Sequence, residues 1–148
     1  MSELSFENTR KILIPTDGSD YSIRAAEFGV SIAKLIKADV TVVYVIDTLV
    51  LDQIAKLAER SEVERELKGD GERYLNYVHG IAEKAGVKVS SLLAKGRPFE
   101  QIVHIAKGLQ VDLIVMGTFG RRSADRILIG SVAERVIEYS SCPVLVVK

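Results

Sequence analysis

Short apolar runs alternate along the chain with longer segments in which apolar residues recur at helical spacing. Runs rich in Val, Ile and Leu predict strands, and continuous runs such as KILIPT are typical of strands buried on both faces. The third run alternates between apolar and polar positions, which also favours a strand. The five predicted strands cover residues 11–16, 40–46, 87–94, 111–116 and 143–147.

The segments between these runs predict four helices. In residues 22–36 the apolar positions fall on one helical face, and Ser19 or Asp20 can cap the start. Residues 52–84 begin with a solvated, charged half and continue into an apolar stripe, and we expect Gly69 and Gly71 to weaken the middle. The remaining helices are predicted over residues 98–109, with an inner face of Ile102, Ile105, Ala106 and Leu109, and 131–139, with Val132, Val136 and Ile137 inward.

The resulting order of elements is βαβαβαβαβ. Strands joined by helices require crossover connections, and these give a parallel sheet. The sequence therefore predicts a single α/β domain over residues 1–148, a doubly wound, Rossmann-like fold with a five-stranded parallel sheet and helices on both faces. Neither an internal repeat nor a Pro- or Gly-rich linker divides it.

Composition limits the classes of function. Lys plus Arg and Asp plus Glu each number 20, so the net charge of +0 gives no overall field that would hold nucleic acid or an anionic membrane. No stretch approaches the roughly 18 apolar residues that span a bilayer. Cys142 is the lone cysteine, which excludes an internal disulfide and a zinc-type cysteine cluster. We expect a cytoplasmic protein.

The loop after the fourth predicted strand is the strongest candidate for a binding site. Gly117 and Gly120 follow that strand, and Gly130-Ser131 opens the next helix. Glycine lets backbone N–H groups approach a phosphate closely, and a helix start adds unpaired N–H groups and a positive dipole end. Three arginines and one aspartate in residues 121–126 make the loop locally positive.

The same residues also have a purely structural interpretation. Glycine after a strand is a common turn device, and Ser131 with Glu134 fits a helix capping box. Such a cap would explain Ser131 without any ligand. The two interpretations are compatible, because a capped helix start still leaves other N–H groups uncovered.

Thr16 ends the first predicted strand and Asp17 follows it, at the edge where ligands bind in open parallel sheets. Asp17 could bond a ribose hydroxyl or an adenine amino group, or hold a metal with the phosphates, or it could form an Asx-turn beside Gly18. Thr16 could expose backbone groups to a base or end the strand. His79 and His104 lack Ser, Cys or Asp neighbours in the sequence, so we interpret both as structural or exposed.

The chain resembles the universal stress protein family over nearly its whole length. The resemblance rests on residues 12–19 (ILIPTDGS), 45–47 (VID), 115–120 (VMGTFG), 130–134 (GSVAE) and 142–147 (CPVLVV). In that family the spacing G-2x-G-9x-G-[S/T] marks members that bind ATP, and residues 117–131 follow it.

The resemblance implies roles for individual residues. Those implied to bind adenosine are Pro15, Thr16 and Asp17, with Val40 at the base and Met116 lining the nucleotide pocket; those implied to hold ribose and phosphates are Gly117, Gly120, Gly130, Ser131 and Val132. The resident ligand would be ATP, AMP or ADP, with Mg²⁺ or Mn²⁺ accompanying the phosphates. Phe119 departs from the polar residue of many members. Homodimers through the last strand, residues 143–147, are also implied, and pairing would cover an apolar edge.

Three functions compete on the sequence alone. No Walker lysine follows the glycines and no general base accompanies them, which favours a nucleotide-binding stress or signalling protein with slow or no hydrolysis. A slow ATPase or an adenylating enzyme is the alternative, although residues 15–19 do not match an adenylating loop. A phosphorylated receiver would need an acidic residue after the third strand, where Ala94-Lys95-Gly96 stands.

Overall fold

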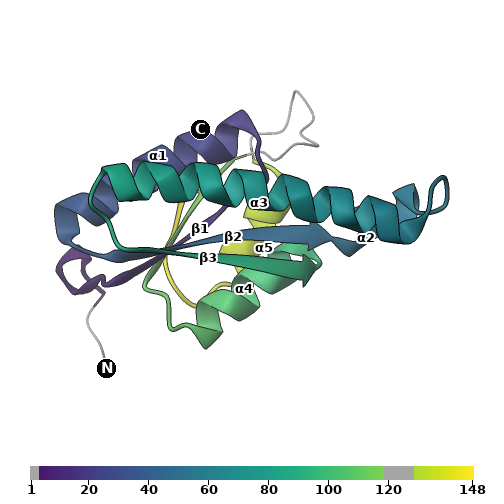
Figure 1. The fold of residues 1–148 in the computed structure, drawn as a ribbon. Helices are drawn as coiled ribbons and strands as arrows, with labels where there is room; N and C mark the ends of the chain where they lie inside the picture. Colours follow the sequence, from purple (N-terminus) through teal and green to yellow (C-terminus); the bar gives the residue numbers. More distant parts are fainter. Residues whose placement is uncertain (1–3, 119–128) are drawn as a thin grey trace.

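The computed structural model describes residues 4–118 and 129–148. Its centre is a five-stranded sheet in the order β3-β2-β1-β4-β5, in which all neighbouring strands are parallel (Figure 1). The strands are β1 (Lys11–Pro15), β2 (Asp39–Asp47), β3 (Val89–Gly96), β4 (Leu113–Gly117) and β5 (Val144–Val147). This topology confirms the predicted doubly wound α/β fold.

Helices cover both faces of the sheet. Those described are η1 (Phe6–Asn8), α1 (Asp20–Ile36), α2 (Thr48–Ile54), α3 (Arg60–Lys84), α4 (Pro98–Gly108) and α5 (Ser131–Tyr139). α1 and α3 lie on one face, and α4 and α5 lie on the other (Figure 1). Ser19 caps α1 by accepting a hydrogen bond from the Ser22 N–H, as one of the two predicted caps.

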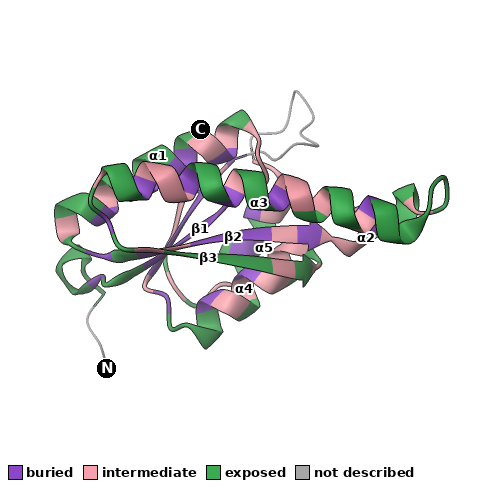
Figure 2. Cartoon of the chain, in the orientation of Figure 1, coloured by how far each residue is buried: buried purple, intermediate pink, exposed green. Residues whose placement is uncertain are grey.

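The core forms two layers, one on each side of the sheet. Ile12 and Ile14 of β1 pack toward α1 and α3, whereas Leu13 packs toward α4 and α5. Successive strand residues point to opposite faces, so a central strand with both faces covered needs an unbroken apolar run. Figure 2 shows this burial along the inner strands and the exposed outer faces of the helices.

The predicted helix over residues 52–84 is two helices, and the break is not at the glycines. α2 ends at Ile54 and α3 begins at Arg60, whereas Gly69 and Gly71 lie inside an uninterrupted α3. Gly71 is buried, and a Cβ there would collide with the ring of Tyr44. A glycine that looks like a helix breaker therefore lets α3 lie close to β2.

Two residues that were predicted to face the core are exposed. Leu109 is 38% exposed because α4 ends at Gly108, and Ile137 of α5 is 47% exposed. Ala133 and Val136 form the buried face of α5 in its place. An apolar residue near the end of a short helix satisfies the helical spacing without reaching the core.

Candidate functional site

The order of the strands reverses between β1 and β4. From β1 the chain builds outward through β2 to β3, and it then returns to place β4 and β5 on the other side. The crevice beyond the carboxyl ends of strands at such a reversal is where open α/β sheets bind ligands. The loop after β1 leaves the carboxyl end of one of these strands, and Gly130 at the start of α5 bonds Thr118, directly after the other.

The loop after β1 is held in one conformation by its own side chains. Asp17 Oδ1 accepts a hydrogen bond of 2.9 Å from the Ser19 N–H, which forms an Asx-turn. Thr16 is buried, and its Oγ1 lies 3.2 Å from Ser22 Oγ in the first turn of α1. The Thr16 N–H donates to the carbonyl of Val43. These bonds anchor the loop to both β2 and α1.

Asp17 forms the Asx-turn that was one of its two interpretations from the sequence. The turn also fixes the carboxylate at the carboxyl edge of β1, where it is partly exposed. A carboxylate has two oxygens and about four acceptor sites, so it can accept the bond from Ser19 and a bond from a ligand at the same time. The turn role and a ligand role are therefore compatible.

The start of α5 lies against the end of β4. The Gly130 N–H donates to the carbonyl of Thr118, and the Thr118 N–H donates to that of Val147 at the end of β5. The first helical bond runs from the Glu134 N–H to the carbonyl of Gly130. The N–H groups of Ser131, Val132 and Ala133 therefore precede the helical ladder, as the first donors of any helix do.

The predicted capping box at Ser131 is wrong. Gly130 is the N-cap residue and Ser131 is the first residue inside the helix, so its hydroxyl is not at the cap position. Among the described residues no side chain caps this helix start. Gly130 has ordinary extended backbone angles, with φ −71° and ψ 159°. Because it has no side chain, Gly130 itself covers none of the donors of the first turn.

Gly117, the last residue of β4, is a glycine for a packing reason. A Cβ at this position would lie 2.8 Å from the backbone carbonyl carbon of Tyr21 in α1. No Cβ contact in real proteins is that close, so any larger residue would push α1 away from the sheet. The sequence argument assigned this glycine to phosphate approach, and the structure adds a second constraint that the sequence does not reveal.

The structure excludes Val40 from this site. Val40 pairs with Ile12 near the amino ends of β1 and β2, whereas the last residue of β1, Pro15, pairs with Val43. Val40 is 1% exposed and lies three residues back from the carboxyl edge. Val45 lies two residues beyond Val43 on the same face, is half-buried, and reaches the carboxyl edge that Val40 does not. Counting paired residues back from the carboxyl ends of the two predicted strands would have identified Val45 in place of Val40.

Met116 lies beneath the site. Its side chain is 5% exposed and packs in the layer that contains Leu13, Val43 and Ala133. It therefore supports the ends of β1 and β4 from below. Of the remaining predicted positions, Gly120, Phe119 and the arginines of residues 121–126 lie outside the described residues.

His79 has neighbours that the sequence did not reveal. Its Nδ1 lies 3.1 Å from Ser91 Oγ and its Nε2 lies 2.9 Å from Glu83 Oε1. Ser91 is distant in the sequence and becomes a neighbour because the fold brings β3 under α3; the partly exposed ring agrees with the structural or exposed interpretation of His79. All three side chains are partly or fully exposed on α3 and β3, two strands away from β1. They link a helix to an edge strand and do not belong to the candidate site.

An ion pair lies at the carboxyl end of β3, the edge strand two positions from β1. Lys95, at the end of β3, bonds Glu64 of α3, and this hydrogen bond and the Lys95 charge lower the pKa of the Glu64 carboxyl. Among the described residues no three His, Cys, Asp or Glu side chains gather as metal ligands. Within residues 4–118 and 129–148 no helix has the length and apolarity to cross a bilayer.

Comparison with known proteins gives a consistent result. Residues 8–148 match the model of the universal stress protein family. The chain is similar to universal stress protein MJ0531 of Methanocaldococcus jannaschii, with 44% identity over 94% of this chain and 82% of that protein.

Two solved structures are also similar. That of MJ0577, from the same organism, has a TM-score of 0.83 and 34% identity over 94% of this chain and 95% of the other. That of the universal stress protein from Archaeoglobus fulgidus in complex with dAMP has a TM-score of 0.67 and 25% identity, covering 95% and 98%.

Proposed function

The chain belongs to the universal stress protein family, and we propose that it binds an adenine nucleotide, ATP in the first place, in the crevice between the carboxyl ends of β1 and β4. The observation that carries the proposal is the start of α5, which no side chain of the described residues caps and which the bond from Gly130 to Thr118 holds against the end of β4. Backbone donors at a helix start form a ready anion site. The relative in complex with dAMP supports an adenine nucleotide as the ligand.

The two loops divide the nucleotide between them. Pro15, Thr16 and Asp17 lie at the end of β1, where the adenosine would bind, and Asp17 offers its carboxylate to ribose or base. Val45 takes the place at the base that was expected for Val40, because it reaches the carboxyl edge. The position of Met116 gives the pocket an apolar floor.

The phosphates would lie at the start of α5. Gly130, Ser131 and Val132 supply the first turn, and the Ser131 hydroxyl can donate to a phosphate oxygen. Gly117 and Gly120 complete the glycine spacing, although Gly120 lies outside the described residues. Asp17 is the described carboxylate suited to Mg²⁺ or Mn²⁺ carried by the phosphates.

The protein is proposed as a binding module with slow or no hydrolysis. Ser131 follows Gly130 directly, without the lysine that stands between glycine and Ser/Thr in a Walker loop, and both histidines lie on helices away from the β1–β4 crevice. A general base must reach the attacking water within about 3 Å. A slow ATPase remains the alternative, and turnover that is lost in Asp17→Ala while binding persists would favour it.

We expect calorimetry to show ATP binding to the purified protein, with and without Mg²⁺, and Asp17→Ala to weaken it by at least tenfold. Charge-assisted hydrogen bonds contribute about 1.5–3 kcal/mol, and each 1.4 kcal/mol is a factor of ten. Asp39→Ala is the matched control, because Asp39 is exposed at the amino end of β2. A folded wild-type protein that binds no adenine nucleotide would refute the proposed function.

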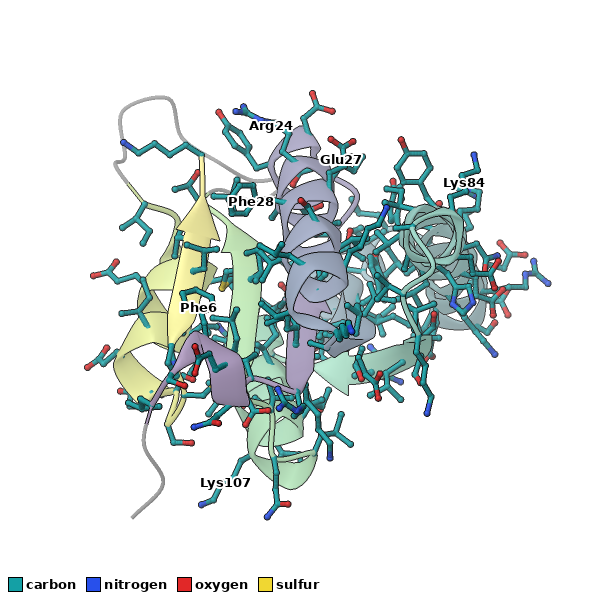
Figure 3. The ribbon with its side chains drawn as sticks, turned by 90° about the vertical axis from the view of Figure 1, so that its left-hand side faces the viewer. Phe6, Arg24, Glu27, Phe28, Lys84 and Lys107 are labelled. Atoms are coloured by element: carbon teal, nitrogen blue, oxygen red, sulfur yellow. The ribbon has the colours of Figure 1, made fainter. Side chains whose placement is uncertain are left out.

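A homodimer through β5 is the second part of the proposal. β5 is an edge strand whose four residues are all half-exposed, and such an edge is a template for pairing with another chain. Phe28 projects from α1 on the side of β5 and is 51% exposed (Figure 3). A second copy would cover both. We place the protein in the cytoplasm, where Cys142 would stay reduced.

Val146→Pro should convert the dimer to a monomer without unfolding it. The carbonyls of Pro143 and Val147 accept hydrogen bonds from β4, so alternation along the strand directs the Val146 N–H to the free edge. Proline is tolerated at such a position but cannot donate to a partner strand. Sedimentation should show the halved mass, with an unchanged circular dichroism spectrum. A wild-type monomer at tens of micromolar would disprove the dimer.

A further inference from the structure

The ring of Tyr74 in α3 covers the loop after β1 on the side of the sheet where α1 and α3 pack. Gly18 has φ +81°, a conformation that favours glycine, and a Cβ there would collide with Cζ, Cε1 and Cε2 of that ring. The ring therefore lies directly on the backbone of the loop. Together they line a shallow pocket formed by Thr16, Gly18, Ile23, Arg73, Tyr74 and Tyr77.

The ring of Tyr74 is itself supported from the core. It packs on the ring of Tyr44 in β2, with centroids 6.0 Å apart and a tilt of 44°. Tyr44 is buried, and Gly71, one turn before Tyr74 in α3, makes room for it. A tilted aromatic pair adds stability beyond the area that it buries. A continuous set of packed groups therefore runs from β2 to the backbone of Gly18.

We propose that Tyr74 is a positioning residue, whose ring holds the Asp17–Ser19 turn in the geometry that receives the adenosine; this inference rests on the proposed function. Gly18 has no side chain with which to anchor the turn. Glycine also has more backbone conformations to lose than any other residue, so packing against Gly18 narrows the geometries of the turn further than its hydrogen bonds alone do. The ring of Tyr74 supplies that packing.

The positioning role of Tyr74 follows from the contacts that link its ring to Gly18 and Gly18 to Asp17. Asp17 precedes Gly18 and its Oδ1 is bonded to the N–H of Ser19, so a movement of Gly18 displaces both ends of that bond. Binding then has to order the turn before the carboxylate can meet the ligand, and this ordering weakens the apparent affinity. Tyr74 itself need not touch the nucleotide.

The test compares ATP affinity in three variants. Tyr74→Ala should weaken ATP binding by about tenfold, whereas Tyr74→Phe, which keeps the ring, should stay within twofold of wild type. Tyr77→Ala is the matched control, because Tyr77 is exposed and lines the same pocket, whereas the three atoms nearest a Cβ placed on Gly18 all belong to Tyr74. Equal losses in Tyr74→Ala and Tyr74→Phe, or no loss in either, would overturn the proposal.

A double-mutant cycle separates positioning from a general loss of stability. If Tyr74 acts through Asp17, Tyr74→Ala should cost little further affinity in an Asp17→Ala background, since coupled residues are non-additive. Fully additive losses would overturn the proposal. Hydrogen exchange of the Ser19 amide gives a readout without nucleotide. Faster exchange in Tyr74→Ala but not in Tyr77→Ala supports the role of the ring even if wild-type protein fails to bind ATP, which would refute the proposed function alone.

Discussion

Gly130→Asp is expected to reduce ATP affinity by about a hundredfold or more while the protein stays folded. The new carboxylate would stand at the N-cap of α5, where it can accept hydrogen bonds from the donors of the first turn. A phosphate would then lose those donors and meet a negative charge in their place. A hundredfold loss corresponds to about 2.7 kcal/mol, a size that a displaced and repelled charge contact readily reaches.

The thermal stability of Gly130→Asp should not fall with its ATP affinity. The backbone angles of Gly130, φ −71° and ψ 159°, suit any residue, and aspartate is a better N-cap than glycine by a few tenths of a kcal/mol. The thermal midpoint should therefore be unchanged or about 1 °C higher. Calorimetric titration and thermal unfolding of the same preparation check both effects.

Gly130→Asn is the matched control for charge. Asparagine caps helices about as well as aspartate but carries no charge, so it should cover the donors without repelling phosphate. We expect an affinity between those of wild type and Gly130→Asp. If Gly130→Asp binds ATP as wild type does, the start of α5 is not the phosphate site.

Much of the fold could be predicted because burial on both faces leaves a clear pattern. The run KILIPT predicts β1 within one residue, since each of its side chains must fit one of two covered faces. The helix break between α2 and α3 could not be predicted in the same way. Gly71 matches a helix breaker in the sequence, and only the collision of its Cβ with Tyr44 shows why it stands inside a helix.

The candidate site could be predicted where neighbours in sequence are neighbours in space. Asp17, Gly130 and Ser131 follow their strands directly or open a helix, so the rule for the carboxyl edge locates them. The prediction for Val40 was wrong because the strand was identified correctly but the residue lies near its amino end, away from the carboxyl edge. The contacts of His79 with Ser91 and of Tyr74 with Gly18 depend on how α3 lies across the sheet, and no local pattern records that.

The glycines of the predicted motif differ in what they require. Gly130 is the helix cap and its backbone angles suit any residue, so its conformation does not require glycine; the proposed phosphate site would account for its missing side chain. Gly117 is constrained by the backbone of Tyr21 whether or not a ligand is present. The motif proposed as one phosphate loop thus contains a position whose backbone does not require glycine and a position where packing does. Substitutions at the two should have different readouts.

Gly117→Ala is therefore expected to lower the free energy of unfolding by about 2–3 kcal/mol, the usual cost of overpacking a rigid site. Its Cβ would lie 2.8 Å from the carbonyl carbon of Tyr21, and backbone cannot move aside as a flexible side chain can. Urea unfolding of the protein without nucleotide measures the loss. Gly80→Ala is the matched control, because nothing lies within 4 Å of the added Cβ and alanine favours the helix by about 0.5–1 kcal/mol. A Gly117→Ala protein as stable as wild type would show that α1 can shift to make room for the Cβ. Packing against Tyr21 would then not explain the glycine, and the proposed ligand would be its remaining explanation.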